Sequence, residues 1–218
     1  MFVLLLAVIL MPVNLYADSS AGRFTHIDGK VNIQRPGAGK LIPVDRGDEI
    51  SIGDTVVTGA GSHAHVAFVD KSFVYMAPNS RLMVTHYSLT KIYTGDERRK
   101  AVLNLMEGKI RAIAKGYAVW DSDFIVETPT TSASAREADF VIAATPSETN
   151  VAVLNGRVTI KNISSFIVGE MFLRQNQSSA VKKNLPPAQP VTLTLEQRIG
   201  HIKEIMGHGI DRTQKGVK

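Results

Sequence analysis

Residues 53–76 read GDTVVTGAGSHAHVAFVDKSFVYM and carry the clearest fold signal in the chain. Two runs in this stretch, Ala64–Val69 and Ser72–Met76, are rich in β-branched or aromatic residues and have the length and alternation of β-strands. Turn-forming residues precede them, first at Gly53-Asp54 and then at Gly59-Ala60-Gly61. Short strands separated by tight turns indicate an all-β protein.

The same pattern continues on both sides of this stretch. Val31–Ile33 and Val151–Leu154 are further candidate strands, and turn signals recur roughly every 8 to 12 residues. No helical periodicity long enough for a βαβ unit separates them, so a doubly wound parallel sheet is not expected. We predict that residues 18–183 form one all-β domain, a β-roll or solenoid-like sandwich of many short strands.

One local pattern, a turn glycine followed by a basic residue and an alternating apolar run, occurs three times. Its copies are Asp28–Ile33, Glu107–Ala112 and Asn155–Ile160, at unequal intervals that exclude a fixed-period repeat. Glycine can adopt the positive φ that such a turn requires. Two interpretations stay open: similar structural corners used three times in a roll or barrel, or turns that only look alike.

The chain changes character after Lys183, so residues 184–218 form a separate region. Leu185–Pro190 contains three prolines and indicates an extended linker. Thr194 is a candidate cap for a short amphipathic helix with an apolar face of Leu195, Ile199, Ile202 and Met206. We expect this helix to fold back onto its own domain, and the basic tail after it, with Arg212, Lys215 and Lys218, to be solvated.

Residues 1–17 have the pattern of a signal peptide. Met1–Leu10 is almost wholly apolar, and Tyr16-Ala17-Asp18 changes to polar chain, with cleavage predicted after Ala17. The apolar run is shorter than the ~20 residues that span a bilayer, and no later stretch is apolar enough to do so. A buried N-terminal strand or helix is the alternative. We therefore expect an exported protein, periplasmic or secreted, with no stable membrane span after cleavage.

The composition excludes several classes of protein. The chain has 218 residues and no cysteine, which excludes disulfide frameworks, zinc ribbons and thiol nucleophiles. Its net charge of +5 is mild, and the basic residues are scattered without interleaved aromatic residues, so a nucleic-acid partner is not expected. A chain of this length can bury a hydrophobic core without staples. Nothing in the sequence indicates an oligomeric state.

Two histidines are candidate metal ligands. His63 and His65 are two residues apart and would share one face of a strand, where His86 or Asp70 could complete a site for a divalent ion. No third ligand has an identifiable spacing, so the simpler interpretation places both histidines on a solvent-exposed face. We predict no metal site.

A second group could carry sugar chemistry. Trp120, with Asp121 and Asp123, resembles a loop that stacks on a sugar, although core packing is the more common place for a tryptophan. The sequence shows no Gly-x-Ser-x-Gly elbow, no distinctive Ser-His-Asp order and no glycine-rich phosphate loop. We therefore predict that the chain is not an enzyme, with no catalytic residues and no cofactor.

The order of turns and strands resembles the FecR-domain family of bacterial periplasmic proteins over about residues 22–180. Three segments carry the resemblance: Gly53–Gly59 with Ser62–Pro78, Leu105–Arg111, and Phe124–Thr130 leading into Arg136–Ile142. The chain departs from the family pattern at two turns. Glu137-Ala138 replaces a Gly-Thr pair, which removes a hydroxyl from that corner. Lys71 replaces a glycine, which implies a different turn type or some strain.

The matched residues also predict local structure. Asp54 is expected to bind nearby amides in a tight turn, Pro129 to end a strand, and Arg136 to hold two turns together through carbonyls or a carboxylate. The side chains expected to face the core are Phe124, Val126, Phe140 and Ile142.

Three hypotheses for the function follow. The first is an exported, non-enzymatic β-domain that binds or scaffolds an envelope protein or glycan. The second, implied by the resemblance, is a FecR-type periplasmic sensor; the best-known members belong to inner-membrane regulators that respond to iron–siderophore receptors through a cytoplasmic anti-sigma segment. The third is a metal- or sugar-dependent enzyme on the same fold. The sequence favours the first hypothesis, because it indicates export and a β fold but contains no recognisable set of catalytic residues.

Overall fold

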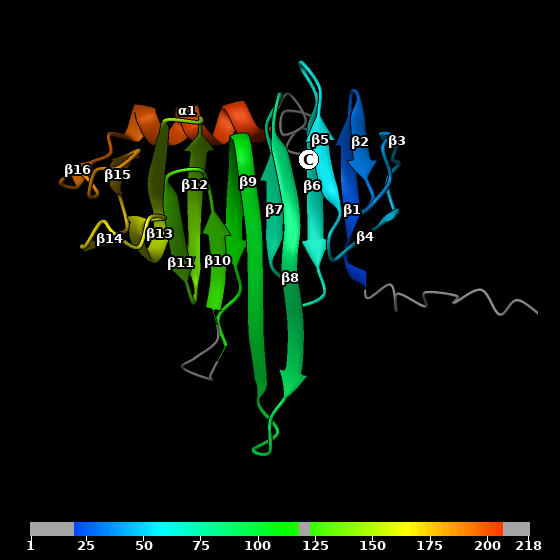
Figure 1. Ribbon diagram of the computed structural model, residues 1–218, viewed down its shortest axis with the longest axis horizontal. Helices are drawn as coiled ribbons and strands as arrows, with labels where there is room; N and C mark the ends of the chain where they lie inside the picture. Colours follow the sequence, from blue (N-terminus) through cyan, green and yellow to red (C-terminus); the bar gives the residue numbers. More distant parts are fainter. Residues whose placement is uncertain (1–19, 118–122, 207–218) are drawn as a thin grey trace, which may run out of the picture.

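The computed structural model describes residues 20–117 and 123–206, which fold into sixteen β-strands followed by one α-helix (Figure 1). This confirms the all-β class and the short helix near the C-terminus. Residues 1–17, Trp120, Asp121 and the basic tail lie outside the described residues, so the predictions made for them stay predictions.

Hydrogen bonds join the strands into one continuous sheet that bends into two halves, which we call sheet A and sheet B. Two long strands contribute to both halves, namely β9 (Glu97–Ala114) and β13 (Glu148–Asn162). Sheet A also contains β1 (Ser20–Asp28), β4 (Glu49–Ser51), β6 (His63–Phe68), β7 (Phe73–Met76), β12 (Ala138–Ala144), β15 (Gln177–Lys182) and β16 (Val191–Thr192). Sheet B also contains β2 (Val31–Gln34), β3 (Ile42–Pro43), β5 (Thr55–Thr58), β8 (Arg81–Lys91), β10 (Asp123–Glu127), β11 (Thr131–Ala135) and β14 (Glu170–Arg174).

The pairing between strands is almost entirely antiparallel. Only β9 and β10 run parallel among the pairs of the described chain. Coils of a parallel β-solenoid would pair in the same direction throughout. The strands therefore make a bent antiparallel sheet rather than the stacked coils of a solenoid, and the expectation of an all-β protein holds at this coarser level.

The three glycine motifs lie where the chain passes from one sheet to the other. Gly29 separates β1 from β2, whereas Gly108 and Gly156 lie inside β9 and β13, with φ angles of 94° and 83°. A Cβ on any of the three would lie within 2.5 Å of a neighbouring corner of the chain, for example 2.4 Å from the Cα of Ser80 at Gly108. The interpretation as corners used three times is confirmed. The expectation of a separate turn is wrong at Gly108 and Gly156, because the strand continues through the bend.

Inward-facing side chains of both sheets form one hydrophobic core. The four residues expected to face it from the family resemblance, Phe124, Val126, Phe140 and Ile142, are all fully buried there. Pro129 lies between β10 and β11, which confirms that it follows the end of a strand. The alternation read from the sequence thus assigns the inner face correctly.

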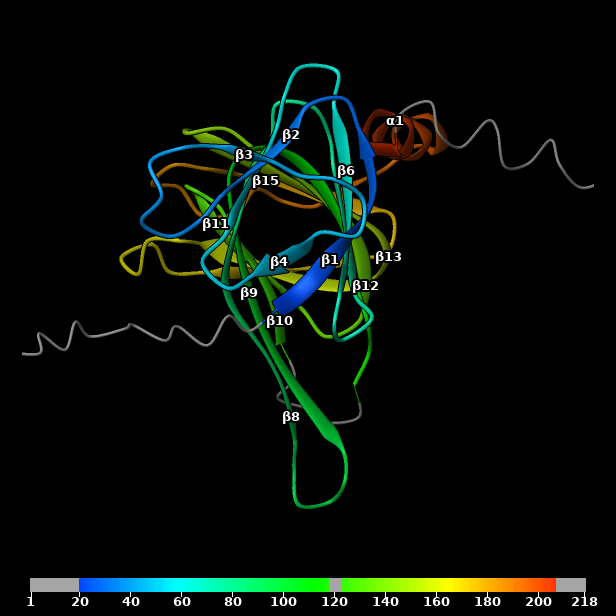
Figure 2. The same ribbon diagram turned by 90° about the vertical axis from the view of Figure 1, so that its right-hand side faces the viewer.

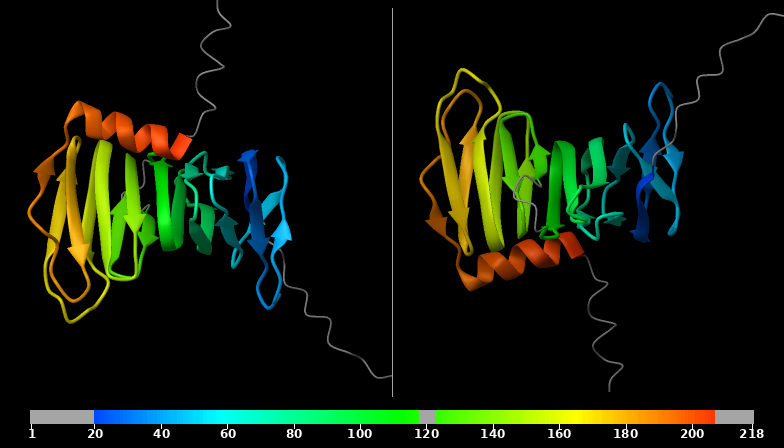
Figure 3. Two further views of the ribbon diagram at one scale, coloured as in Figure 1. Left: turned by 90° about the horizontal axis from the view of Figure 1, so that it is seen from above. Right: turned by 90° about the horizontal axis from the view of Figure 1, so that it is seen from below.

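Helix α1 (Leu195–Met206) lies across the outer face of sheet A (Figure 3). The Thr194 hydroxyl accepts a hydrogen bond from the amide of Gln197 at 3.2 Å, and the Gln197 side chain accepts one from the amide of Thr194 at 2.9 Å. This reciprocal cap confirms Thr194 as the helix start. The helix folds back onto the domain as expected. Ile202 of the expected apolar face packs against sheet A together with Ile205, whereas Leu195 and Ile199 are exposed.

A long hairpin formed by β8 and β9 projects from one end of the molecule (Figures 1 and 2). The strands pair out to Lys91 and Glu97, and Tyr93 at the tip is fully exposed. A bulge between Val84 and His86 interrupts the register where the hairpin leaves the body. No helix among the described residues is long and apolar enough to cross a membrane.

Candidate functional site

The outer faces of the two sheets differ in what covers them. On sheet A, α1 buries a second apolar cluster that includes Val141, Ala152 and Leu154 of the sheet and Ile205 of the helix. Figure 3 shows the helix crossing the strands on this side. In the described part of the chain no helix lies over sheet B, so a binding site is best sought on its outer face.

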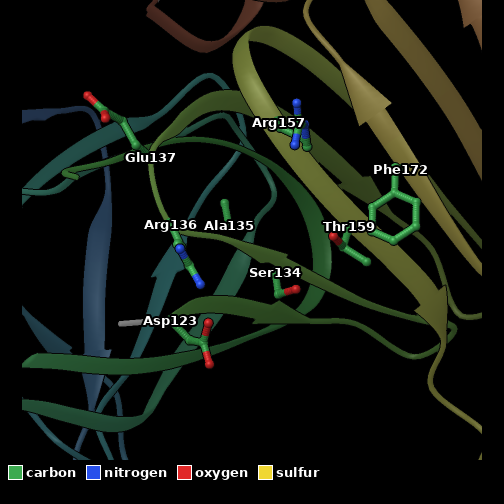
Figure 4. A pocket seen from close by; sticks show the side chains of 8 residues that line it. All are labelled: Asp123, Ser134, Ala135, Arg136, Glu137, Arg157, Thr159 and Phe172. Atoms are coloured by element: carbon green, nitrogen blue, oxygen red, sulfur yellow. The ribbon is translucent and has the colours of Figure 1, made fainter. Parts of the chain in front are cut away.

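A shallow pocket of about 520 Å³ lies on this open face, over β10, β11, β13 and β14 (Figure 4). Three of its side chains come from neighbouring positions on adjacent strands. Ser134 pairs with Thr159, and Thr159 pairs with Phe172 on its other side. Two hydroxyls and one aromatic ring therefore lie side by side, a combination suited to contact with a polar but partly apolar surface.

Charged residues border the pocket where β11 leads into β12. Arg136 and Glu137 lie at this corner, Arg157 lies on β13, and Asp123 begins β10. In Figure 4 the side chain of Arg136 extends toward Asp123, while that of Glu137 points away from it. All four residues are exposed. The mixture of both charges favours a partner with complementary charges, such as a protein surface, over a simple anion.

A fully buried arginine, Arg99 on β9, fixes the corner beside this pocket. Its Nη2 donates a hydrogen bond to the carbonyl of Arg136 at 2.8 Å, and its Nη1 donates to the carbonyl of Lys115 at 2.7 Å. Nη1 also lies 3.1 Å from Oδ2 of Asp70 and 3.1 Å from Oγ of Ser72. Arg136 was expected to hold two turns together through carbonyls or a carboxylate. Arg99 makes contacts of this kind, because its guanidinium binds two backbone carbonyls and the carboxylate of Asp70.

Two tyrosines complete this network around Asp70. The Tyr87 hydroxyl donates to Oδ1 of Asp70 at 2.5 Å, and the Tyr117 hydroxyl donates to the Asp70 carbonyl at 2.8 Å. Burial and the adjacent carboxylate raise the pKa of Tyr87 far above its ordinary value, so it remains a neutral donor. The Arg99 guanidinium also lies 5.3 Å from the ring centres of Tyr117 and Phe124.

Sequence reasoning missed Arg99, because it lies in the charged run Arg98-Arg99-Lys100 that looks solvated. One signal could have found it. Arg99 shares the period-2 alternation of Ala101, Leu103 and Leu105, all of which are fully buried. A cation on the inner face of a strand requires a buried anion, and Asp70 supplies it.

Asp54 behaves as expected from the sequence. Its Oδ2 accepts a hydrogen bond from the amide of Ser51 at 2.7 Å, which closes the turn before β5, and it also pairs with Arg35 at 2.5 Å. The carboxylate is buried. Lys71 has a φ of 65°, in the region that glycine favours, so of the two expected possibilities, a different turn type or some strain, the structure shows the second.

The histidines do not assemble a metal site in the part of the chain that the structure describes. His63 and His65 share the outer face of β6, but Asp70 is buried with Arg99 and His86 is exposed on β8. No group of three potential ligands occurs among residues 20–117 and 123–206. The expectation of a solvent-facing pair is wrong for His63, which is 9% exposed and lies 3.2 Å through Nε2 from the Glu204 carbonyl of α1.

His65 is enclosed by aromatic rings. The ring of His26 lies 4.8 Å away and that of Tyr75 lies 4.7 Å away, centre to centre. Its Nε2 is buried without a hydrogen-bond partner among the described residues. Burial, together with His26 and His63, lowers the pKa of His65 to about 4, so the imidazole is neutral at physiological pH.

The corner with the altered family motif lacks a hydrogen bond that the other two corners have. The amide after Gly29 donates to Oγ of Ser62 at 2.8 Å, and the amide after Gly108 donates to Oγ of Ser80 at 2.9 Å. Ala138 packs against Gly156 in the corresponding position and has no hydroxyl to offer. The substitution noted in the sequence therefore removes a repeated structural contact, at a corner that borders the pocket.

Comparisons with known proteins agree with the fold. Two crystal structures of a "putative anti-sigma factor" from Parabacteroides distasonis are similar to this chain. The one at 2.50 Å has a TM-score of 0.53 and 15% identity, over 68% of this chain and 64% of that one. The one at 1.65 Å has a TM-score of 0.54 and 14% identity, over 74% of each chain. This chain thus spans just under two thirds of the first relative, and these identities show the fold alone.

No curated protein sequence matches the chain. The model of the family described as FecR protein matches residues 54–159. This range contains the turn of Asp54, the Arg99 network, the altered corner at Arg136–Ala138 and the strands that carry Ser134 and Thr159. Residues 54–159 of this chain are therefore similar to a FecR domain.

Proposed function

We propose that this chain is a regulatory module of a signal-transduction pathway, which acts by binding another protein and carries out no chemistry of its own. The similarity of residues 54–159 to a FecR domain is the observation that carries this proposal. The likeness in fold to proteins described as anti-sigma factors supports it further. These comparisons support the signalling hypothesis better than the hypothesis of an envelope scaffold or glycan binder.

The open face of sheet B is where we place the contact with the partner. The charged side chains around the pocket, including Arg136 and Arg157, are exposed, as is usual for the polar rim of a protein interface. The Arg99 network fixes the backbone of the pocket corner, so the face is presented in one arrangement and binding incurs little ordering cost. A rigid, mixed-charge, partly aromatic face suits the recognition of a protein.

We further propose that the protein works outside the cytoplasm, as the apolar segment at residues 1–17 indicates. Cell fractionation, with protease added to intact and to permeabilised cells, tests this location. A protein that keeps residues 1–17 and fractionates with the cytosol would contradict it.

The test of the regulatory function compares transcripts in the parent strain, in a deletion strain and in complemented strains. Ser134→Trp fills the pocket, and Asn150→Trp places the same side chain on an exposed position of β13 in sheet A. We expect deletion to change a limited set of transcripts, Asn150→Trp to restore them, and Ser134→Trp to fail at equal protein level. An unchanged transcript profile on deletion would exclude the proposal.

A further inference from the structure

Strand β14 is an edge of sheet B whose free side differs from the other edges of the described sheet. It pairs only with β13 and has five residues, Glu170–Arg174, with no proline and no lysine. The edges at β3 and β16 are two residues long and that at β4 is three, and Pro43 lies in β3. The hairpin edge of β8 carries a bulge and Lys91. Short, bulged or proline-containing edges resist pairing with another chain, and β14 has none of these protections.

Apolar side chains gather around this edge. Phe166 and Val168 in the connection before β14 are 91% and 90% exposed, and Phe172 in its centre is 56% exposed. Ile163, which directly follows β13, is exposed as well. Clusters of exposed large apolar residues in so short a segment are typical of surfaces that another molecule covers.

The backbone of β14 offers hydrogen bonds on the side away from β13. The amide of Arg174 donates to Oε1 of Gln177 at 2.9 Å, so it does not face β13. Backbone groups alternate between the two sides of a strand, and therefore the amides and carbonyls of Phe172 and Glu170 also point away from β13. The free side of the strand thus centres on Phe172.

The charges of β14 are complementary to those of a second copy of the same strand. Glu170, Phe172 and Arg174 lie at every second position of β14, so their side chains share one face of the strand. If two copies pair antiparallel about a two-fold axis at Phe172, each Glu170 lies opposite Arg174 of the other copy, and the two phenylalanines lie opposite each other. Opposite charges and aromatic pairs both stabilise directly opposed positions.

Within the monomer, Glu170 lies opposite Lys161 on β13, but the charge of Arg174 is not balanced by its neighbour. Arg174 lies opposite Arg157 on β13, a pair of like charges that is unfavourable at directly opposed positions. No ion pair involves Glu170 or Arg174 within residues 20–117 and 123–206. A second copy would supply the missing carboxylate to each Arg174.

From this geometry we propose that the protein forms a symmetric dimer in which β14 strands pair antiparallel at Phe172, with Glu170 of each copy opposite Arg174 of the other. The interface is isologous and closed, so it forms dimers and not fibres. It joins the open faces of two copies of sheet B into one continuous surface. The dimer goes beyond the proposed function and does not depend on it.

The first test is the mass of the purified protein in sedimentation equilibrium, from about 1 µM to about 1 mM, since a small edge interface associates weakly. We expect the average mass to rise toward that of a dimer. Glu170→Arg and Arg174→Glu should each weaken the dimer about tenfold or more, because each places two pairs of like charges across the axis. The double variant Glu170→Arg/Arg174→Glu restores both pairs and should associate within about threefold of the parent.

Arg174→Glu also serves as a control for folding. It replaces the like-charge pair with Arg157 by an opposite pair, so it should not lower the stability of the monomer. Loss of association in this variant therefore reports on the dimer and not on unfolding.

A second test uses the absence of cysteine from the chain. Two Phe172→Cys copies would bring their thiols directly opposite, within the range of a disulfide. We expect fast oxidation to a covalent dimer, much faster than for Asn150→Cys on sheet A. Glu170→Cys should cross-link with Arg174→Cys in a mixture, but neither with itself.

Three results would overturn the dimer: a constant monomer mass, association that ignores both charge reversals, or cross-linking at position 172 no faster than at position 150. If the protein is a monomer at every concentration, the dimer is excluded, and the β14 edge would instead be a candidate site for a strand of another protein. These measurements use pure protein without any partner, so their failure would leave the proposed regulatory function standing.

Discussion

The two outer faces of the bent sheet show how one chain treats a covered and an open surface. On sheet A the outward positions under α1 are apolar, as at Val141 and Leu154, and the chain buries them with its own helix. On sheet B the outward positions around the pocket are polar or charged at Ser134, Thr159 and Arg157, and only Phe172 among its exposed lining residues is apolar. The domain thus covers one outer face with its own helix, whereas the outer face of sheet B around the pocket is exposed to solvent.

The largest loss of stability is expected on substitution of Arg99, which is buried beneath the open face. Arg99→Ala leaves the carboxylate of Asp70 buried without its cation and should lower the free energy of unfolding by about 3–5 kcal/mol. Urea unfolding followed by circular dichroism measures this loss. The double variant Asp70→Asn/Arg99→Met, which removes both charges, should recover part of it. A loss below about 1 kcal/mol would mean that surface groups, and not this network, hold the pocket corner.

A matched pair of truncations compares the faces directly. Ile205→Ala removes the fully buried side chain of α1 and should cost about 2–4 kcal/mol, whereas Phe172→Ala on the open side should cost less than about 0.5 kcal/mol. The same urea experiment measures both variants. Equal losses would contradict the division into a covered and an open face.

The covered side should also respond to pH through His65. The folded-state pKa is about 4 against 6.5 for a free histidine, so the unfolded chain takes up a proton that the folded chain refuses. The contribution to stability is therefore complete above pH 6.5 and is lost as the pH falls toward 4. Since His65 is partly exposed, we expect a loss of about 1–2 kcal/mol across this window.

His65→Gln should reduce this pH dependence when the free energy of unfolding is compared at pH 7 and pH 5. His86→Gln, at an exposed position of β8, is the control and should leave it unchanged. If His65→Gln and the parent lose stability equally between these two pH values, another group on the covered side is responsible.

The smallest change in stability is expected on substitution of Ala138, at the corner beside the open pocket. Ala138→Ser supplies the hydroxyl that Ser62 and Ser80 provide at the other two corners and should raise stability by about 0.5–1.5 kcal/mol. Thermal unfolding measures this gain, and Ser80→Ala should lose a similar amount. An Ala138→Ser variant with an unchanged or lower melting temperature would show that the three corners are not equivalent.

Local patterns were enough to predict the inner face and the turn at Asp54. Alternation placed Phe124 and Ile142 in the core, and turn chemistry assigned Asp54 its hydrogen bond to a nearby amide. Both depend on residues close in sequence, where strand geometry and side-chain reach leave few choices. The helix start at Thr194 followed for the same reason.

The errors lie where distant residues meet. His63 was expected in solvent, but α1 covers it with the Glu204 carbonyl, 141 residues along the chain. Leu195 and Ile199 were expected to pack, but the direction in which α1 crosses sheet A turns Ile205 inward instead. Neither the docking of a helix nor the angle of its crossing can be read from its own periodicity.

The all-β class and the inward alternation followed from the sequence alone, since each depends on neighbouring residues and on backbone conformation, whereas the sequence left open whether the three glycine motifs mark equivalent corners. The sequence did not predict which sheet α1 covers, that Arg99 contacts Asp70, or that β14 lies at an edge of the described sheet. Those features arise from contacts between segments far apart in the chain. Many pairings of short strands satisfy the same local pattern, and packing of the whole domain selects one of them.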